Sequence, residues 1–207
     1  MMTQLTAATY PRTTVILRDA SVELADAVVQ TIAEEHLRIA VEITRNSANF
    51  SDIERYAADH PKLAIGAGTV VDVTGARSAI DLGCQFILSP VVLDRSVVEL
   101  CHEAGLLVVS GGYTPTEIHT AVQNGADIVK VFPIGQLSAS YIKDVRAPLG
   151  EVPIMGVGGV SIANMGDLFS RGVNYVGLGS SLFGQEPLPR ENVQRILREL
   201  DSATREG

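Results

Sequence analysis

Short runs of consecutive apolar and β-branched residues alternate along the chain with longer stretches in which apolar residues recur every three to four positions. The short runs predict strands, and the longer stretches predict amphipathic helices. The predicted strands span residues 13–17, 39–44, 64–67, 85–88, 106–109, 128–132, 154–157 and 175–178. The predicted helices span residues 21–35, 51–59, 73–82, 93–103, 115–124, 139–147, 162–170 and 190–204.

The predicted strands are apolar throughout instead of alternating, which is typical of a parallel sheet covered on both faces. Eight strand–helix units suit a (β/α)₈ TIM barrel, a compact one at 207 residues beside the usual ~250. The alternative is a doubly wound open sheet, which usually has a glycine-rich first turn. The residues after the first predicted strand are Arg18-Asp19-Ala20-Ser21, so we favour the barrel, as one domain over residues 1–207.

The composition and net charge limit the kind of protein that the chain forms and the partners that it can bind. Hydrophobic residues make up 46% of the chain and charged residues 19%, as in soluble globular proteins. The net charge of -8 argues against a nucleic-acid partner, which requires clustered Lys and Arg. No apolar run approaches the ~20 residues that span a bilayer. Two cysteines, Cys84 and Cys101, form no disulfide framework, and no secretory signal is visible, so we expect a cytoplasmic protein.

Lys130 is the most informative charged residue, because it lies in an otherwise apolar predicted strand, in Ile128-Val129-Lys130-Val131-Phe132. Burial lowers the pKa of a lysine. The neutral amine is the nucleophile that condenses with a ketone to form a Schiff base. The alternative is a structural lysine paired with a carboxylate.

Glu42 is a second charge within an apolar predicted strand, Ile39-Ala40-Val41-Glu42-Ile43. Opposite charges from two strands of one barrel are expected to meet in its lumen. A carboxyl group beside a Schiff-base lysine could transfer protons if burial raises its pKa. The alternative is a plain buried ion pair.

Glycines follow the last two predicted strands, at Gly158-Gly159 and Gly179-Ser180. This corner of a TIM barrel commonly binds phosphate, and glycine lets backbone N–H groups approach an anion closely. We expect no metal site, because none of the four histidines has a second ligand at zinc-like spacing. No cofactor is expected either, since Gly66-Ala67-Gly68-Thr69 lacks the nucleotide-binding spacings.

Taken together, several motifs resemble the 2-keto-3-deoxy-6-phosphogluconate / 4-hydroxy-2-oxoglutarate aldolase family, including its 6-phosphogalactonate branch. The matching motifs follow the family's order from about residue 13 to residue 183. They are Val15-Ile16-Leu17-Arg18, Val41-Glu42-Ile43-Thr44, Ile65-Gly66-Ala67-Gly68-Thr69-Val70, Ser89-Pro90, Thr114-Pro115-Thr116-Glu117, Val129-Lys130-Val131-Phe132-Pro133, Gly158-Gly159-Val160 and Gly177-Leu178-Gly179-Ser180.

The resemblance implies a metal-independent class I aldolase that cleaves a 2-keto-3-deoxy-6-phospho sugar acid reversibly to pyruvate and glyceraldehyde 3-phosphate. Lys130 would form the Schiff base and Glu42 would act as the general acid/base. The resemblance assigns the remaining site residues as follows: Arg45 and Thr69 to the pyruvyl carboxylate, Pro90 and Phe132 to the pocket wall, Arg18 to an anionic group, and Gly158, Gly159, Gly179 and Ser180 to the phosphate. Members of the family are commonly homotrimers.

The chain departs from the family's pattern at two informative positions. Asn46 stands where the carboxylate-binding Arg is common, and Arg45 lies one residue earlier, so either Arg45 or Arg18 would bind the carboxylate. Val157 stands where gluconate-type members often have Thr, which leaves the C4 configuration of the substrate open.

Two other functions remain as alternatives: another phosphate-binding barrel enzyme, such as a thiamine-phosphate synthase-like protein or an isomerase, and a non-catalytic barrel that binds a sugar acid.

Overall fold

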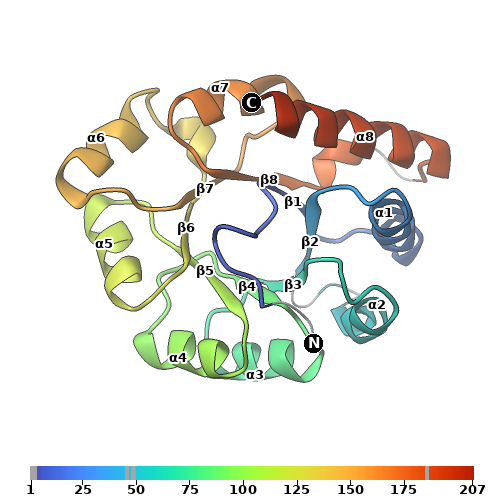
Figure 1. Cartoon of the computed structure of the whole chain (residues 1–207), viewed down its shortest axis with the longest axis horizontal. Coiled ribbons are helices and arrows are strands. Elements are labelled where there is room, and N and C mark those ends of the chain that lie inside the picture. The colour runs from blue at the N-terminus through green and yellow to red at the C-terminus, as the bar shows by residue number, and fades with distance from the viewer. Residues whose placement is uncertain (1–3, 45–46, 48–49, 185–186) are drawn as a thin grey trace.

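The structure is a computed structural model that describes residues 4–44, 47, 50–184 and 187–207. Within this part of the chain, parallel strands close into a barrel in the order β1 to β8, and helices surround it (Figure 1). The strands are β1 (Thr13–Leu17), β2 (Ile39–Thr44), β3 (Ile65–Gly68), β4 (Phe86–Leu88), β5 (Leu107–Gly111), β6 (Ile128–Val131), β7 (Ile154–Val157) and β8 (Tyr175–Gly179). The predicted (β/α)₈ TIM barrel is confirmed.

Each strand is followed by a helix on the outside of the barrel. The helices are α1 (Val22–Glu34), α2 (Ile53–Asp59), α3 (Val73–Asp81), α4 (Arg95–Glu103), α5 (Pro115–Gln123), α6 (Tyr141–Leu149), α7 (Ile162–Ser170) and α8 (Arg190–Glu206). Short 3₁₀ helices are η1 (Phe50–Asp52), η2 (Ile134–Gln136) and η3 (Ser180–Phe183). No helix among the described residues is both long and apolar enough to cross a membrane.

The predicted bounds were wrong by one or two residues at several elements. The helix expected from residue 93 begins at Arg95, because Asp94 is still extended and serves as its N-cap. The helix expected at 139–147 is Tyr141–Leu149, with Pro148 inside its last turn. The strand expected at 64–67 is Ile65–Gly68, and the strand expected to include Phe132 ends at Val131.

Two separate apolar clusters result from the closed sheet. The larger one fills the space between strands and helices. The smaller one fills the barrel lumen, with side chains two residues apart along the strands, such as Leu107 and Val109 on β5. On β2 and β6 the lumen-facing series continues toward the carboxyl end from Ala40 to Glu42 and from Ile128 to Lys130. Both charged side chains therefore lie above an apolar floor.

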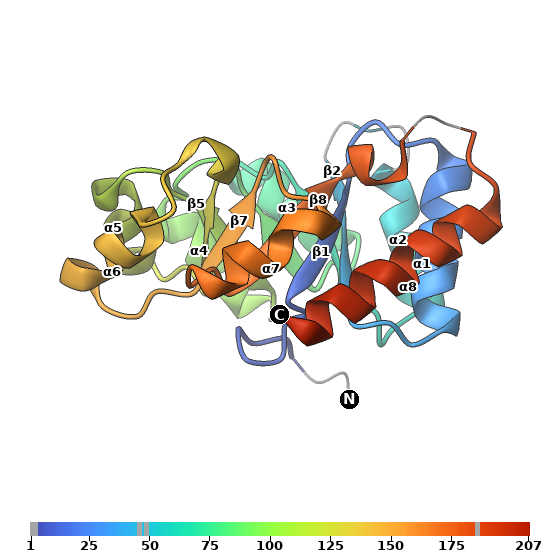
Figure 2. The ribbon, with the colours of Figure 1, turned by 90° about the horizontal axis from the view of Figure 1, so that it is seen from above.

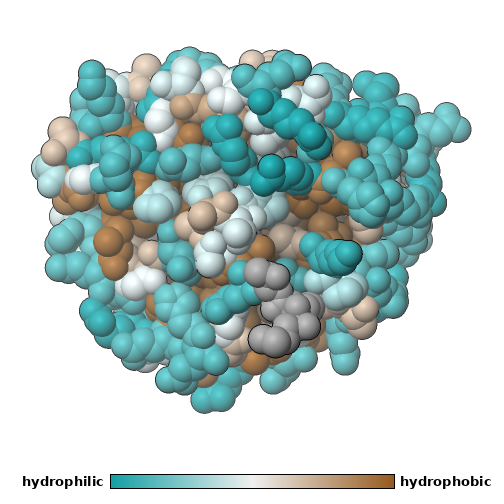
Figure 3. Space-filling model, in the orientation of Figure 1, coloured by the Kyte–Doolittle hydropathy of each residue, from teal (hydrophilic) through white to brown (hydrophobic). Residues whose placement is uncertain are grey.

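The N-terminal segment closes the opposite end of the barrel. Tyr10 is buried, and its ring makes edge contacts with Phe86 at 5.1 Å and Tyr175 at 5.8 Å between centroids. Its hydroxyl lies 2.8 Å from Thr14 Oγ1, and the Tyr175 hydroxyl donates to the Ala7 carbonyl over 2.6 Å. Figure 1 shows this segment crossing the centre of the ring, and Figure 2 shows it below the strands. In the space-filling view, atoms of moderate hydropathy fill the centre of this face (Figure 3).

Replacing Tyr10 with Ala is therefore expected to lower the free energy of unfolding by about 3–5 kcal/mol, the usual cost of removing a buried aromatic ring. The Tyr10→Phe variant keeps the ring contacts and loses only the hydroxyl pair with Thr14, so its loss is expected to be ~1 kcal/mol. Urea denaturation followed by circular dichroism measures both. A loss below 1 kcal/mol for the Ala variant would show that the segment does not close the barrel.

Candidate active site

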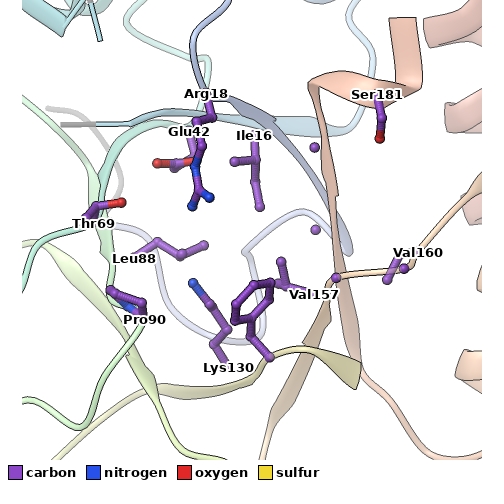
Figure 4. A pocket seen from close by; sticks show the side chains of 15 residues that line it. Ile16, Arg18, Glu42, Thr69, Leu88, Pro90, Lys130, Val157, Val160 and Ser181 are labelled. Carbon is purple, nitrogen blue, oxygen red and sulfur yellow. The ribbon is translucent and has the colours of Figure 1, made fainter. Parts of the chain in front are cut away.

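A cavity of about 320 Å³ opens at the carboxyl ends of the strands. The sequence-predicted site residues that line it are Arg18, Glu42, Thr69, Pro90, Lys130, Phe132, Gly158, Gly159 and Gly179. The structure therefore gathers residues from seven strand ends and their loops into one pocket (Figure 4). Residues that line it without having been predicted are Ile16, Leu88, Val160, Gly177 and Ser181, together with Val157, which was singled out only for stereochemistry.

Three positions named in the sequence analysis are not fully described. Arg45 and the neighbouring Asn46 lie outside the described residues. Ser180 begins η3, but its side chain also lies outside the described part of the structure. The assignment of the carboxylate to Arg45 or to Arg18 therefore stays a prediction.

Lys130 is 5% exposed and extends from β6 into the cavity. Burial in this apolar surrounding disfavours the ammonium form and lowers the pKa of Lys130 to about 8, against an opposing effect of the Glu42 carboxylate. Arg18 lowers it further through like-charge repulsion. The side chain also lies over an aromatic face, with Nζ 5.4 Å from the centroid of the Phe132 ring. A substantial fraction of neutral amine is thus present near physiological pH.

Glu42 is 1% exposed and enters the lumen from β2. Burial raises the pKa of Glu42 to about 7, and the positive charges of Lys130 and Arg18 and a hydrogen bond from Thr44 oppose that effect. The pKa of Glu42 is thus raised and the pKa of Lys130 is lowered, so the two values approach each other. A pair arranged in this way can exchange a proton with a bound molecule at neutral pH.

The Glu42 carboxylate occupies a place that a side chain on β3 would otherwise fill. A Cβ added to Gly68 would lie 1.2 Å from Glu42 Oε1 and 2.1 Å from its Cδ. Thr44 Oγ1 donates a hydrogen bond to the same oxygen, Oε1, over 3.1 Å. Neither contact was predicted, because each depends on the register of β2 against β3, in which Thr44 pairs with Gly68.

The predicted phosphate corner has the backbone form that glycine permits. Gly158 and Gly159 have φ values of 88° and 77°, which are unfavourable for residues with a Cβ. A Cβ on Gly158 would also lie 2.8 Å from the Phe132 ring. Gly179 and Ser181 line the cavity from the neighbouring strand end and η3. Among the described side chains at this corner, the hydroxyl-bearing one that lines the cavity is that of Ser181.

Potential metal ligands and thiols also occur among the described residues outside this cavity. No group of three or more His, Cys, Asp or Glu side chains that could hold a metal ion occurs in the described ranges. Cys84 and Cys101 are buried free thiols, and burial raises the pKa of Cys101 to about 11.

Comparison with known proteins gives a consistent result. The model of the family described as "KDPG and KHG aldolase" matches residues 8–199. The "Probable 2-dehydro-3-deoxy-6-phosphogalactonate aldolase" of Rhizobium meliloti (strain 1021) is 37% identical over 81% of this chain and 80% of that protein. The "2-dehydro-3-deoxy-6-phosphogalactonate aldolase" of Escherichia coli (strain K12) is 33% identical over 70% of this chain and 71% of that protein. A solved structure described as "Native KDPGal structure" has a TM-score of 0.84 at 30% identity and covers 94% of both chains.

The close approach of Gly68 to Glu42 is tested by a double-mutant cycle. Gly68→Ala is expected to lower the free energy of unfolding by about 1–3 kcal/mol, the usual cost of overpacking, because the carboxylate must move. In a Glu42→Ala background the same change is expected to cost much less, since the overlapping atoms are gone. Urea denaturation of the four proteins measures the coupling.

Gly166→Ala is the matched control, since a Cβ at this position in α7 would meet nothing within 4 Å. It is expected to leave stability unchanged or to raise it by up to ~1 kcal/mol through helix propensity. An equal cost of Gly68→Ala with and without Glu42 would contradict the geometry.

Proposed function

This chain belongs to the family of KDPG and KHG aldolases, and on that premise we propose that it is a class I aldolase acting through a Schiff base on Lys130. Its substrate is a 2-keto-3-deoxy-6-phospho sugar acid, cleaved reversibly to pyruvate and glyceraldehyde 3-phosphate. One observation carries the proposal: a lysine with a lowered pKa and a glutamate with a raised pKa share one buried cavity. These are the nucleophile and the proton carrier that the reaction requires.

In the first half of the reaction, the neutral Nζ of Lys130 attacks the C2 carbonyl carbon and forms a carbinolamine. Protonated Glu42 then donates its proton to the departing hydroxyl, so that water leaves and the positively charged imine remains. The raised pKa of Glu42 makes this proton available near neutrality.

In the second half, ionised Glu42 accepts the proton of the C4 hydroxyl. The C3–C4 bond breaks, its electron pair moves into the imine to give an enamine, and the C4 hydroxyl oxygen becomes the aldehyde oxygen of glyceraldehyde 3-phosphate. Protonation of the enamine at C3 and attack of water on C2 release pyruvate and regenerate the Lys130 amine. The same residues serve the reverse reaction.

The anionic ends of the substrate are assigned to opposite sides of the cavity. Thr69, with Arg45 or Arg18, would bind the pyruvyl carboxylate, and Pro90 and Phe132 would form the wall beside it. The phosphate would bind at Gly158, Gly159, Gly179 and Ser180. The two glycines support this assignment, because Gly158 and Gly159 have no Cβ of their own beside their N–H groups.

We further propose that the preferred substrate has the galactonate configuration at C4. Val157 lines the cavity with an apolar side chain, 7% exposed, where a hydroxyl group could otherwise bind the C4 hydroxyl. Two of the similar proteins are named 6-phosphogalactonate aldolases. The enzyme is proposed to act in the cytoplasm as a homotrimer, without a metal or organic cofactor.

The Schiff base is tested by borohydride reduction in the presence of pyruvate, followed by peptide mass spectrometry. We expect one reduced pyruvyl group on Lys130, and a loss of at least about 10³-fold in pyruvate release for Lys130→Met. Lys143→Met, at an exposed position of α6, is the control and should be trapped and turn over like the parent protein. Turnover without trapping would favour another phosphate-binding barrel enzyme, and binding without pyruvate release would indicate a non-catalytic protein.

The C4 configuration is tested by pyruvate release from galactonate- and gluconate-derived 2-keto-3-deoxy-6-phospho acids. The parent protein is expected to prefer the galactonate-derived acid. Val157→Thr should move the ratio of the two kcat/KM values about 5- to 10-fold toward the gluconate-derived acid. This factor corresponds to the free energy that one added hydrogen bond to the C4 hydroxyl contributes. An unchanged ratio would show that Val157 does not contact this part of the substrate.

A further inference from the structure

Thr44 and Glu42 are two residues apart on β2, so both side chains face the lumen. Thr44 Oγ1 lies 3.1 Å from Glu42 Oε1 and 3.5 Å from Oε2, in donor geometry to both oxygens. Thr44 is 8% exposed and Glu42 only 1%, so water has little access to compete for this contact. The hydroxyl therefore supplies a directed, protected hydrogen bond to the carboxylate.

The same carboxylate also lies against the bare backbone of Gly68. Gly68 pairs with Thr44 in the sheet, and its missing Cβ leaves the space in which Glu42 Oε1 lies. Thr44 and Gly68 thus form a recess on adjacent strands, which we call the carboxylate recess. In Figure 4 the carboxylate of Glu42 points toward the Thr69 side of the cavity, while the Lys130 amine points to its centre.

Several groups could draw the carboxylate out of this recess or change its charge. Two cations act on it, Lys130 from β6 and Arg18 after β1. Tyr10 below it and Cys84 behind β3 are neutral, because burial raises the pKa of each above its ordinary value. Among the ion pairs of the described residues, none joins Glu42 to Lys130, although both side chains line the same cavity. A carboxylate that moved onto Nζ would occupy the place where the C2 carbonyl must approach.

We propose that Thr44 is a positioning residue: its hydroxyl, together with the side-chain-free Gly68, holds the Glu42 carboxylate on the β3 side of the lumen and keeps the space above Lys130 open for the keto acid. The proposal rests on the function proposed above. It adds a role for a residue that touches neither the ketone carbon nor the amine. The recess also retains Glu42 in one place between its two proton transfers.

Thr44→Val is the decisive variant, since it keeps the shape and removes the donor. We expect kcat for pyruvate release to fall about 10- to 100-fold, within the range that a misplaced acid/base group costs, while KM changes less than about threefold. Thr44→Ser restores the hydroxyl and should return kcat to within about threefold of the parent protein. Urea midpoints and circular dichroism establish that each variant is folded, and Thr44→Ala replaces the Val variant if that one is insoluble.

The pH profile separates a positioning role from a packing role. The acidic limb of kcat/KM reports the Glu42–Lys130 pair taking up its second proton. The Thr44 hydroxyl stabilises ionised Glu42 and so lowers its pKa. Its removal should therefore move the acidic limb upward by about 0.4–1 pH unit, and Thr44→Ser should return it.

The outcomes distinguish this proposal from the function on which it rests. If the parent protein forms no trapped adduct with pyruvate, the proposed function is wrong. If the parent protein is trapped and Thr44→Val retains the parent kcat and acidic limb, Thr44 does not position Glu42. A Thr44→Ser variant as impaired as Thr44→Val also overturns the proposal, because packing alone would then explain the loss. If Lys130 of Thr44→Val is trapped to the same final extent as in the parent protein after long incubation, while turnover is slow, the proposal is supported.

Discussion

Lys130 and Glu42 are both buried in the barrel lumen, and the properties of the site depend on that burial. Charges are costly to remove from water, so each group shifts toward its neutral form, and the pKa values of Lys130 and Glu42 approach one another. In the proposed reaction, this shift in the two pKa values provides the nucleophilic amine and the proton carrier. The environment of the pair is therefore as much a part of the chemistry as the two side chains.

The remainder of the lumen maintains that environment. Tyr10, supplied by the N-terminal segment, packs on Phe86 and Tyr175 and closes the floor. Above this floor, glycines leave space open. Gly68 leaves room for the Glu42 carboxylate, and Gly158 leaves room for the Phe132 ring. With the floor closed, the described cavity opens at the carboxyl ends of the strands, where loops from neighbouring units meet.

Much of this arrangement could be predicted from the sequence, for identifiable reasons. A buried parallel strand is a continuous apolar run, so a single charge within it, such as Lys130 or Glu42, is conspicuous. The Thr44 and Gly68 contacts could not be predicted, because they depend on which residue of β2 pairs with which residue of β3. The role of Tyr10 was missed because residues 4–12 have no helical or strand periodicity. Helix starts such as Arg95 depend on the backbone angles of the capping residue, which hydrophobic spacing does not encode.

The central claim is that burial lowers the pKa of Lys130 far enough for part of the amine to be neutral near physiological pH, and NMR titration of lysine side chains tests it most directly. The chain has three lysines, Lys62, Lys130 and Lys143, so protein labelled with ¹³C at lysine Cε gives few resonances. We expect one resonance to titrate with a pKa of about 8 and to be missing from Lys130→Met. A spectrum in which no lysine titrates below about pH 10, the ordinary range for lysine, would contradict the claim.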